Sequence, residues 1–400
     1  MIRSSSLNRR NYLYHIGVSM LIVANICFYD MEHIVLYQGM CIFAMMVMLY
    51  TAVRNKELHF GGSRGVLYLT VLYTMYTIYG LFFLRADTYN DDRLIFTFIQ
   101  CVLLYISFRH LLLSENWLRQ LSVSFVISGL FCIAYIIAME KDMIFVSQVE
   151  ERIGDTLSGN VNTIGFSLGM LSYVVTYLYA KTKSKFILFV LLGLMAMMLL
   201  TGSKKTVIII FLDIYTYYIA SKERMSSFIK VLLFGSFIIW LIKDSPYFYE
   251  VIGKRIDDMF STFTGDKLGD YSYSTESREG MIQDGFRLFQ NYPIFGGGMN
   301  YFAFASVKYG HFGYSHCNYT ELLCNFGLFG FLLYYIPYIK NIASAWRIRN
   351  RDRDKSMFII FWLIMGVILG WAMVQFSELC IDYFPIIVSF ALLDNLKSKN

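Results

Sequence analysis

The feature that most constrains this chain is a series of apolar runs, because a helix needs about 20 mainly apolar residues to cross a bilayer. These runs lack the alternation of barrel strands, and an unbroken apolar segment satisfies its backbone polar groups in a membrane only as a helix. The sequence therefore predicts an all-α fold, a single polytopic integral membrane domain over residues 1–400 with about 12 transmembrane helices. The predicted spans are 12–29, 34–53, 65–84, 93–113, 118–139, 160–180, 185–201, 204–220, 227–243, 319–340, 356–376 and 379–394.

Composition excludes the soluble alternative. Hydrophobic residues make up 56% of the chain and charged residues 16%, which is far from the composition of two or three soluble domains. A net charge of +6 over 400 residues is weak, so no nucleic-acid partner is expected. The seven cysteines occur singly, and no zinc-protease or nucleotide-loop motif is present, so the sequence predicts neither a metal nor a cofactor. The first apolar run reads as a retained span rather than as a signal peptide.

Basic residues indicate the orientation, because Lys and Arg concentrate in cytoplasmic linkers. The other linkers, which alternate with the basic ones along the chain, are acidic or nearly neutral. Both termini are therefore predicted to be cytoplasmic. The basic linkers contain Arg3, Arg9 and Arg10; Arg54, Lys56 and Arg64; Arg109 and Arg119; Lys181, Lys183 and Lys185; Lys222 and Arg224; Lys340 to Lys355; and Lys397 and Lys399.

Two features on the predicted outer side break this pattern. The first is a tight turn, Thr201-Gly202-Ser203-Lys204-Lys205, which places two lysines where lysine is disfavoured. These lysines could bind an anion, or they could extend to lipid head groups. The second is a long extracytoplasmic loop, 244–318, between the ninth and tenth predicted spans. A hydrophilic segment of this length usually carries function.

The middle of the long loop predicts a short helix followed by a turn. Apolar residues in 277–290 recur at helical spacing, which is typical of an amphipathic helix on a membrane surface. The helix is expected to end at Asn291-Tyr292-Pro293. The following run of Gly296, Gly297 and Gly298 could wrap around an anion, or it could form a plain turn.

The end of the loop contains a candidate catalytic residue. Asn318 and Glu321 have the spacing of a helix cap, with Asn318 as the N-cap and Glu321 at the third helical position. His316 would then lie beside the positive end of a helix, which disfavours the imidazolium form. A neutral imidazole can act as a general base, although a solvated surface histidine is the alternative.

Cationic residues suggest what this histidine would act on. By the predicted topology Lys204, Lys205 and Arg278 all lie on the outer face, where they could converge on a phosphate or diphosphate. Asp213, deep in a span, is either functional or bonded by a neighbouring helix. Asp352-Arg353-Asp354 has the form of a metal-binding motif but lies in a basic linker, so it is read as a solvated charge run.

Taken in order, these segments resemble the bacterial superfamily of O-antigen ligases and Wzy-type polysaccharide polymerases. The resemblance implies metal-independent, inverting glycosyl transfer from a polyprenyl-diphosphate-linked oligosaccharide, at the outer face of a bacterial plasma (inner) membrane. The segments that carry it are the asparagines of 159–162, TGSKK at 201–205, SREG at 277–280, YPIFGGGMNYF at 292–302 and HCNYTELLCNFGLFGFLLYY at 316–335.

The resemblance also implies roles for individual residues. Lys204 takes the place of a family arginine, with Lys205 able to share its role, and Arg278 matches the loop arginine; all three would bind diphosphate. His316 matches the base that activates the acceptor, whereas Cys317 occupies a usual Asn position and Asn318 follows one place later. Glu321, Gly296 and Gly298 complete the set of expected substrate-binding residues, with Asn318 among them.

The function that this resemblance favours is a polymerase acting on lipid-linked repeat units for O-antigen, capsule or exopolysaccharide. A ligase that transfers the finished glycan to an anchor, and a flippase for the same lipid, are the alternatives. The expected partners are the lipid-linked oligosaccharide and membrane lipids, with a flippase and a chain-length regulator as candidate protein partners.

Overall fold

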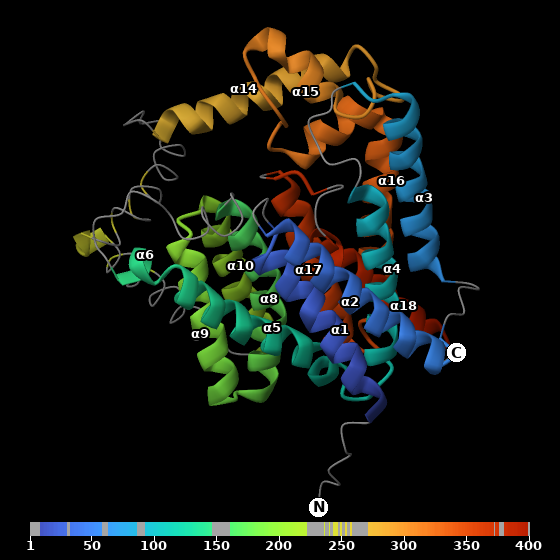
Figure 1. Ribbon diagram of the computed structural model, residues 1–400, viewed down its shortest axis with the longest axis vertical. Helices are drawn as coiled ribbons and strands as arrows, with labels where there is room; N and C mark the ends of the chain where they lie inside the picture. The colour runs from blue at the N-terminus through green and yellow to red at the C-terminus, as the bar shows by residue number, and fades with distance from the viewer. Residues whose placement is uncertain are drawn as a thin grey trace, which may run out of the picture. The chain divides into compact units, whose positions relative to one another are not determined.

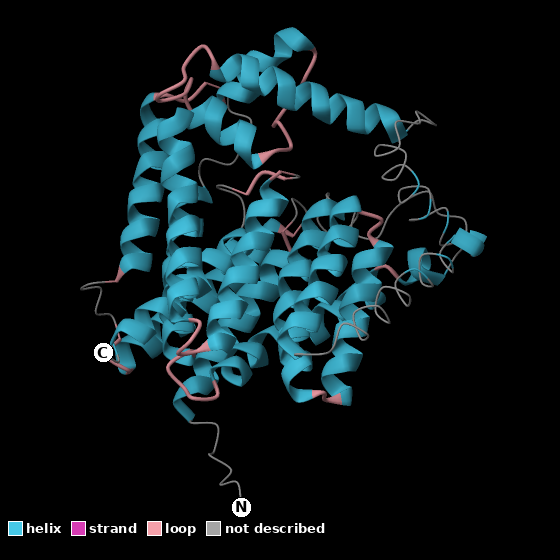
Figure 2. Ribbon diagram, turned by 180° about the vertical axis from the view of Figure 1, so that it is seen from behind, coloured by secondary structure: helices cyan, strands magenta, loops and turns pink. Residues whose placement is uncertain are grey.

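The computed structural model describes residues 9–29, 33–57, 63–85, 93–145, 161–221, 271–371, 373–375 and 380–398, and a few residues between 236 and 257. Over these residues the chain is all-helical, as Figure 2 shows. Outside the helices the structure contains one isolated bridge, between Leu84 and Met299 in the described part of the chain. The prediction of an all-α fold is therefore confirmed.

The helices follow the apolar runs closely. Helices α1–α5, α8–α10 and α16–α18 each coincide with one predicted span (Figure 1). The remaining predicted span, 227–243, falls largely outside the described residues. The helices are α1 Arg9–Cys27, α2 Ile34–Arg54, α3 Arg64–Phe82, α4 Arg93–Leu111, α5 Trp117–Met139, α6 Lys141–Phe145, α8 Val161–Thr182, α9 Lys185–Leu200, α10 Lys204–Ser221, α14 Tyr271–Phe289, α15 Tyr301–Ala305, η2 Ser306–Tyr309, α16 Asn318–Ile348, α17 Arg353–Gly370, η3 Cys380–Tyr383 and α18 Phe384–Ser398.

Six helices in the described ranges are long and apolar enough to cross a membrane, namely α2, α3, α4, α5, α8 and α16. The apolar helices within α1 and α9 are shorter. This pattern is that of a polytopic membrane protein. The total of about twelve spans and the orientation of the termini stay predictions.

The chain divides into two compact units. Unit 1 comprises 1–58 and 110–268, and unit 2 comprises 59–109 and 269–400. In unit 1, α1 packs on α2 and α5, and α8 packs on α5, α9 and α10. Helix α8 is the centre of this unit, since 89% of its apolar window is buried.

In unit 2 the organising element is α16, which packs against α3, α14, α17 and α18. Its 31 residues would span about 46 Å as a continuous helix, more than the roughly 30 Å of a hydrocarbon core. Helix α14 confirms the amphipathic helix predicted within the long loop, although it begins at Tyr271 rather than Ser277. It is anchored to the protein by Leu288, which is buried against Phe302 and Cys324.

Candidate functional site

His316 lies in the last bend before α16. Its φ of +56° places it in the left-handed region, which is uncommon for a residue with a side chain and often marks a functional position. Its half-buried ring packs on that of Tyr314, with the centroids 4.2 Å apart. Both neighbours are buried: the Ser315 N–H donates to Glu321 Oε2 at 2.7 Å, and the Ser315 hydroxyl donates to the Cys317 carbonyl at 2.9 Å. The fold therefore fixes the backbone around an imidazole that stays partly accessible.

The predicted N-cap is wrong. Helix α16 begins at Asn318, its N-cap is Cys317, and no side chain caps it. The Asn318 side chain turns inward instead, where its Nδ2 donates to the Tyr335 hydroxyl and its Oδ1 accepts the Gln375 N–H, both at 2.9 Å. Asn318 thus ties the start of α16 to the segment that follows α17.

Glu321 accepts two hydrogen bonds that fix the bend before α16. It lies in the fourth helical position and is buried, and besides the Ser315 N–H it accepts the Asn325 side-chain amide at 3.1 Å. Burial raises the pKa of the neighbouring Cys317 thiol, so this residue stays a neutral thiol near pH 7. The His316 imidazole stays the predicted base of this bend.

The glycine run forms a turn that docks into an interruption of α16. At Gly327 the helix departs from helical geometry, with φ +65° and ψ −165°. The Gly297 and Gly298 N–H groups donate to the carbonyls of Cys324 and Asn325 at 2.8 and 3.0 Å. In return, the N–H groups of Leu328 and Phe329 donate to the carbonyls of Pro293 and Ile294 at 2.9 and 3.0 Å. We call the paired segments 293–298 and 324–329 the glycine clasp.

The clasp explains why glycine is required at its centre. Gly296 has φ +74°, and a Cβ built on it would lie 2.4 Å from the Asn325 backbone. A Cβ on Gly327 would lie equally close, 2.4 Å, to the Ile294 carbonyl oxygen. The Gly296 N–H also donates within the turn, to the Tyr292 carbonyl at 2.9 Å. The Gly296 and Gly298 amides thus have backbone partners in this turn, and their role in substrate binding stays a prediction.

Helix α3 and the segment that follows it bond to the clasp through Tyr79 and Arg85, which sequence reasoning missed. The Tyr79 hydroxyl donates to the Phe295 carbonyl and the Arg85 Nε donates to the Gly297 carbonyl, both at 2.7 Å. The Arg85 N–H also donates to the Met299 carbonyl at 3.0 Å. The only sequence signal for Arg85 is a basic residue in a linker that is otherwise acidic.

Arg278 lies on α14, which is joined to the segment before α16 by Asp284. This buried carboxylate accepts from Arg287 at 2.7 Å and lies 3.0 Å from His311 Nε2. Arg278 itself is half-buried. Since α14 packs along α16, unit 2 places Arg278 and His316 on neighbouring elements.

In unit 1 the turn after α9 packs on the start of α8. The Ser203 hydroxyl donates to Asn162 Oδ1 at 2.7 Å, so two motifs that lie 41 residues apart meet. The Lys205 side chain is only 7% exposed, which is not the placement expected of a lysine that extends to lipid head groups. The Lys204 side chain lies outside the described residues. Because both lysines belong to unit 1, their convergence with Arg278 stays a prediction.

Two further acidic positions accept hydrogen bonds from neighbouring residues. Asp213 is buried and its Oδ2 accepts the Ser172 hydroxyl at 2.5 Å, so a neighbouring helix bonds it. Asp352 is the N-cap of α17, where its Oδ1 accepts the Lys355 N–H at 3.1 Å. Across the described ranges no three His, Cys, Asp or Glu side chains cluster closely enough to hold a metal ion.

The contact between Ser203 and Asn162 is expected to contribute to stability as a pair. Ser203 is buried, so Asn162→Ala leaves its hydroxyl without this acceptor, at a cost of about 1–3 kcal/mol; Ser203→Ala should cost less, because Asn162 is half-buried. The Asn162→Ala and Ser203→Ala double variant should therefore lose less than the sum of the two single losses, by about 1 kcal/mol. Thermal unfolding of the four proteins in detergent measures this coupling, and strictly additive losses would contradict it.

Over the described residues the fold is that of an all-helical, multi-pass membrane protein. Candidate site residues lie at the start of α16 in unit 2 and, in unit 1, at the turn between α9 and α10. Residues 160–335 match the family model described as O-antigen ligase. The match begins at residue 160, next to the start of α8, and ends within α16, so it includes the Ser203 turn, Arg278 and His316. It supports the superfamily of O-antigen ligases and polymerases and a function in glycan transfer for polysaccharide assembly. A comparison with curated proteins finds no match.

Proposed function

We propose that this protein polymerises lipid-linked oligosaccharide repeat units into a surface polysaccharide, at the outer face of a bacterial plasma membrane. The reaction is an inverting glycosyl transfer from a polyprenyl-diphosphate donor and needs no metal. The observation that supports it best is the left-handed His316 in a bonded backbone at the start of α16, within the segment that matches the O-antigen ligase family. Alternation of basic and acidic linkers supports the outer location.

In this mechanism the oxygen of an acceptor hydroxyl attacks the anomeric carbon of the lipid-linked donor. His316 accepts the proton that this hydroxyl loses. The bond between that carbon and the diphosphate breaks, and Arg278, Lys204 and Lys205 hold the departing lipid diphosphate. Glu321 and Asn318 fix the bend that carries His316, and Gly296 and Gly298 shape the clasp behind it. Positioning and charge stabilisation supply most of the rate enhancement.

A ligase is the second candidate, because the matching family model is itself described as O-antigen ligase. It would use the same donor and the same residues, but its acceptor would be a surface anchor rather than another lipid-linked unit. The acceptor therefore separates the two candidates.

The deciding experiment analyses surface polysaccharide and lipid-linked intermediates in a deletion strain. For a polymerase, the deletion leaves single repeat units outside, and the wild-type protein restores a ladder of longer chains. Accumulation of long lipid-linked polymer would instead identify a ligase. Repeat units trapped on the cytoplasmic leaflet would show that the protein is a flippase and overturn the enzymatic proposal.

Arg278 should be needed for this restoration. Replacing it with alanine is expected to lower polymer formation about 100- to 1,000-fold, the usual effect of losing one group that stabilises developing charge. Arg278→Lys should recover part of the activity, since it keeps a point charge but not the guanidinium fork. Arg287→Ala is the matched control on the same helix, because its side chain is 64% exposed and Asp284 keeps its contact with His311. Equal activity of all three variants would remove Arg278 from the site.

A further inference from the structure

A second polar site lies at the opposite end of α16 from His316. Here a cavity of about 600 Å³ opens between the end of α16, the start of α3 and the end of α18, all within unit 2. Its lining comprises Arg64, Lys340, Ala343, Ser344, Arg347, Ile348, Arg351, Asp352, Leu393 and Leu396. The α16 residues recur at helical spacing, so one face of this helix forms a wall of the cavity.

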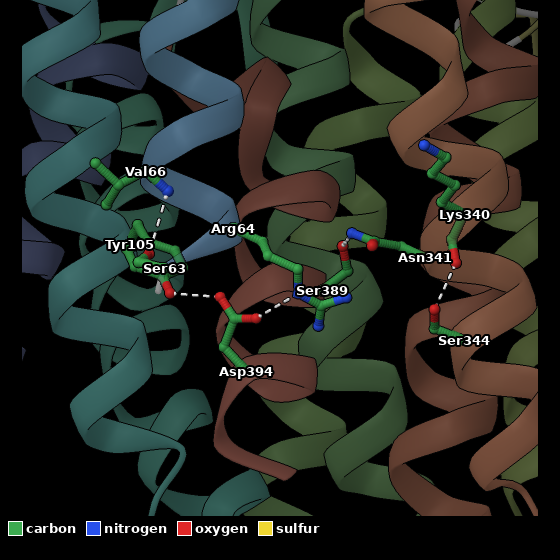
Figure 3. A network of polar contacts seen from close by, with 9 residues as sticks. All are labelled: Ser63, Arg64, Val66, Tyr105, Lys340, Asn341, Ser344, Ser389 and Asp394. Carbon is green, nitrogen blue, oxygen red and sulfur yellow. Dashed lines mark hydrogen bonds and ion pairs between the residues drawn. The ribbon is translucent and has the colours of Figure 1, made fainter. Parts of the chain in front are cut away.

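The cations around this cavity outnumber the acids. Arg64 Nε pairs with Asp394 Oδ1 at 2.9 Å, and the other oxygen of Asp394 accepts the Tyr105 hydroxyl at 2.7 Å (Figure 3). Arg64 Nη2 is buried and bonds to no group in the described part of the chain. The charge of Asp352 is taken up by Lys355, with Nζ 2.8 Å from Oδ2.

Three further cations line the cavity without a carboxylate partner. Among the described residues Lys340, Arg347 and Arg351 make no ion pair. Basic residues are enriched in cytoplasmic linkers, which explains why the charge here is positive. This enrichment does not explain why the cations lie around one cavity. Leu393 and Leu396 give the cavity an apolar wall beside its cationic one.

We propose that this cavity binds the phosphate of an anionic phospholipid head group. Basic pockets between transmembrane helices on the cytoplasmic side are suited to such head groups. Arginine offers forked donors to phosphate oxygens, and Arg64, Arg347 and Arg351 lie in the lining. The apolar side chains would contact the glycerol and the first acyl carbons. The site is separate from the proposed catalytic end of α16 and does not depend on the reaction assigned there.

The test measures lipid binding to the purified full-length protein in detergent. Cardiolipin and phosphatidylglycerol are added in mixed micelles, and their effects on the apparent melting temperature and their dissociation constants are compared with those of phosphatidylcholine. Inorganic phosphate at the same phosphate concentration distinguishes a lipid from a soluble ion. The anionic lipids should raise the melting temperature, whereas phosphatidylcholine and inorganic phosphate should not.

Two double variants with the same loss of charge locate the site. Arg347→Gln with Arg351→Gln removes two cavity cations and should weaken cardiolipin binding about 30-fold, because each basic residue near anionic lipid contributes roughly fivefold. Arg349→Gln with Arg353→Gln removes two exposed cations of the same linker that do not line the cavity, and it should bind nearly as the wild type does. Equal weakening of cardiolipin binding in both double variants would show that the cavity is not the binding site. A shift of the same size with inorganic phosphate would overturn the lipid as its ligand.

Discussion

Replacing His316 with alanine is expected to abolish the polysaccharide ladder in a complemented deletion strain. Loss of a general base typically lowers a rate about 100- to 10,000-fold, which takes polymer formation below what a gel detects. The backbone bonds around the bend come from Ser315, Cys317 and Glu321, not from the imidazole, so the fold should tolerate the change. The measurement is the ladder together with the amount of protein in the membrane.

His311→Ala is the matched control for this prediction. Its ring lies near the same bend, but its Nε2 contacts Asp284, which keeps Arg287 as a second partner. Polymer formation should therefore persist in this variant. A full ladder from the His316→Ala protein would show that the imidazole takes no part in the reaction.

Gly296→Ala is expected to cause the largest loss of stability. The added methyl group would lie 2.4 Å from the Asn325 backbone, at a residue whose φ is +74°. The left-handed conformation alone costs about 1–2 kcal/mol, and the overlap with backbone cannot be relieved by turning a side chain, so the total should exceed about 3 kcal/mol. Thermal unfolding in detergent should show it as a lower melting temperature.

The control for this substitution is Gly310→Ala. Gly310 has a similar φ of +81°, but no atom lies within 4 Å of the position of its Cβ. The Gly310→Ala protein should lose only about 1–2 kcal/mol of stability, the cost of the left-handed conformation for a residue with a side chain. Equal melting temperatures for the two variants would show that the clasp does not need the close approach of Gly296 and Gly327.

Much of the fold could be predicted from the sequence because membrane helices have a direct sequence signal. The apolar runs located α1–α5 and α8–α10 to within a few residues of their ends, whereas the end of α16, the end of α17 and the start of α18 differ by about five to eight residues. Spacing of apolar residues also found α14. Its first turns were missed because the sequence before Ser277 is polar and carries no such spacing.

The predicted site residues stay predictions, and the contacts around them had no signal in the sequence. Gly327 lies within an apolar run, where a glycine usually indicates only close helix packing, so nothing in the sequence pointed to its pairing with Gly296. The cap was misplaced because Asn318 has the chemistry of an N-cap, yet its buried partners Tyr335 and Gln375 come from distant parts of the chain. Arg85 was missed for the same reason, since its contact with Gly297 joins segments 212 residues apart.

The interruption of α16 at Gly327 constrains the order in which the protein can assemble. Inside a bilayer an unbonded backbone N–H costs several kilocalories per mole, and those of Leu328 and Phe329 find their acceptors on Pro293 and Ile294. The ribosome makes that acceptor segment before it makes α16. We therefore expect α16 to reach its final geometry only when the earlier segment docks against it.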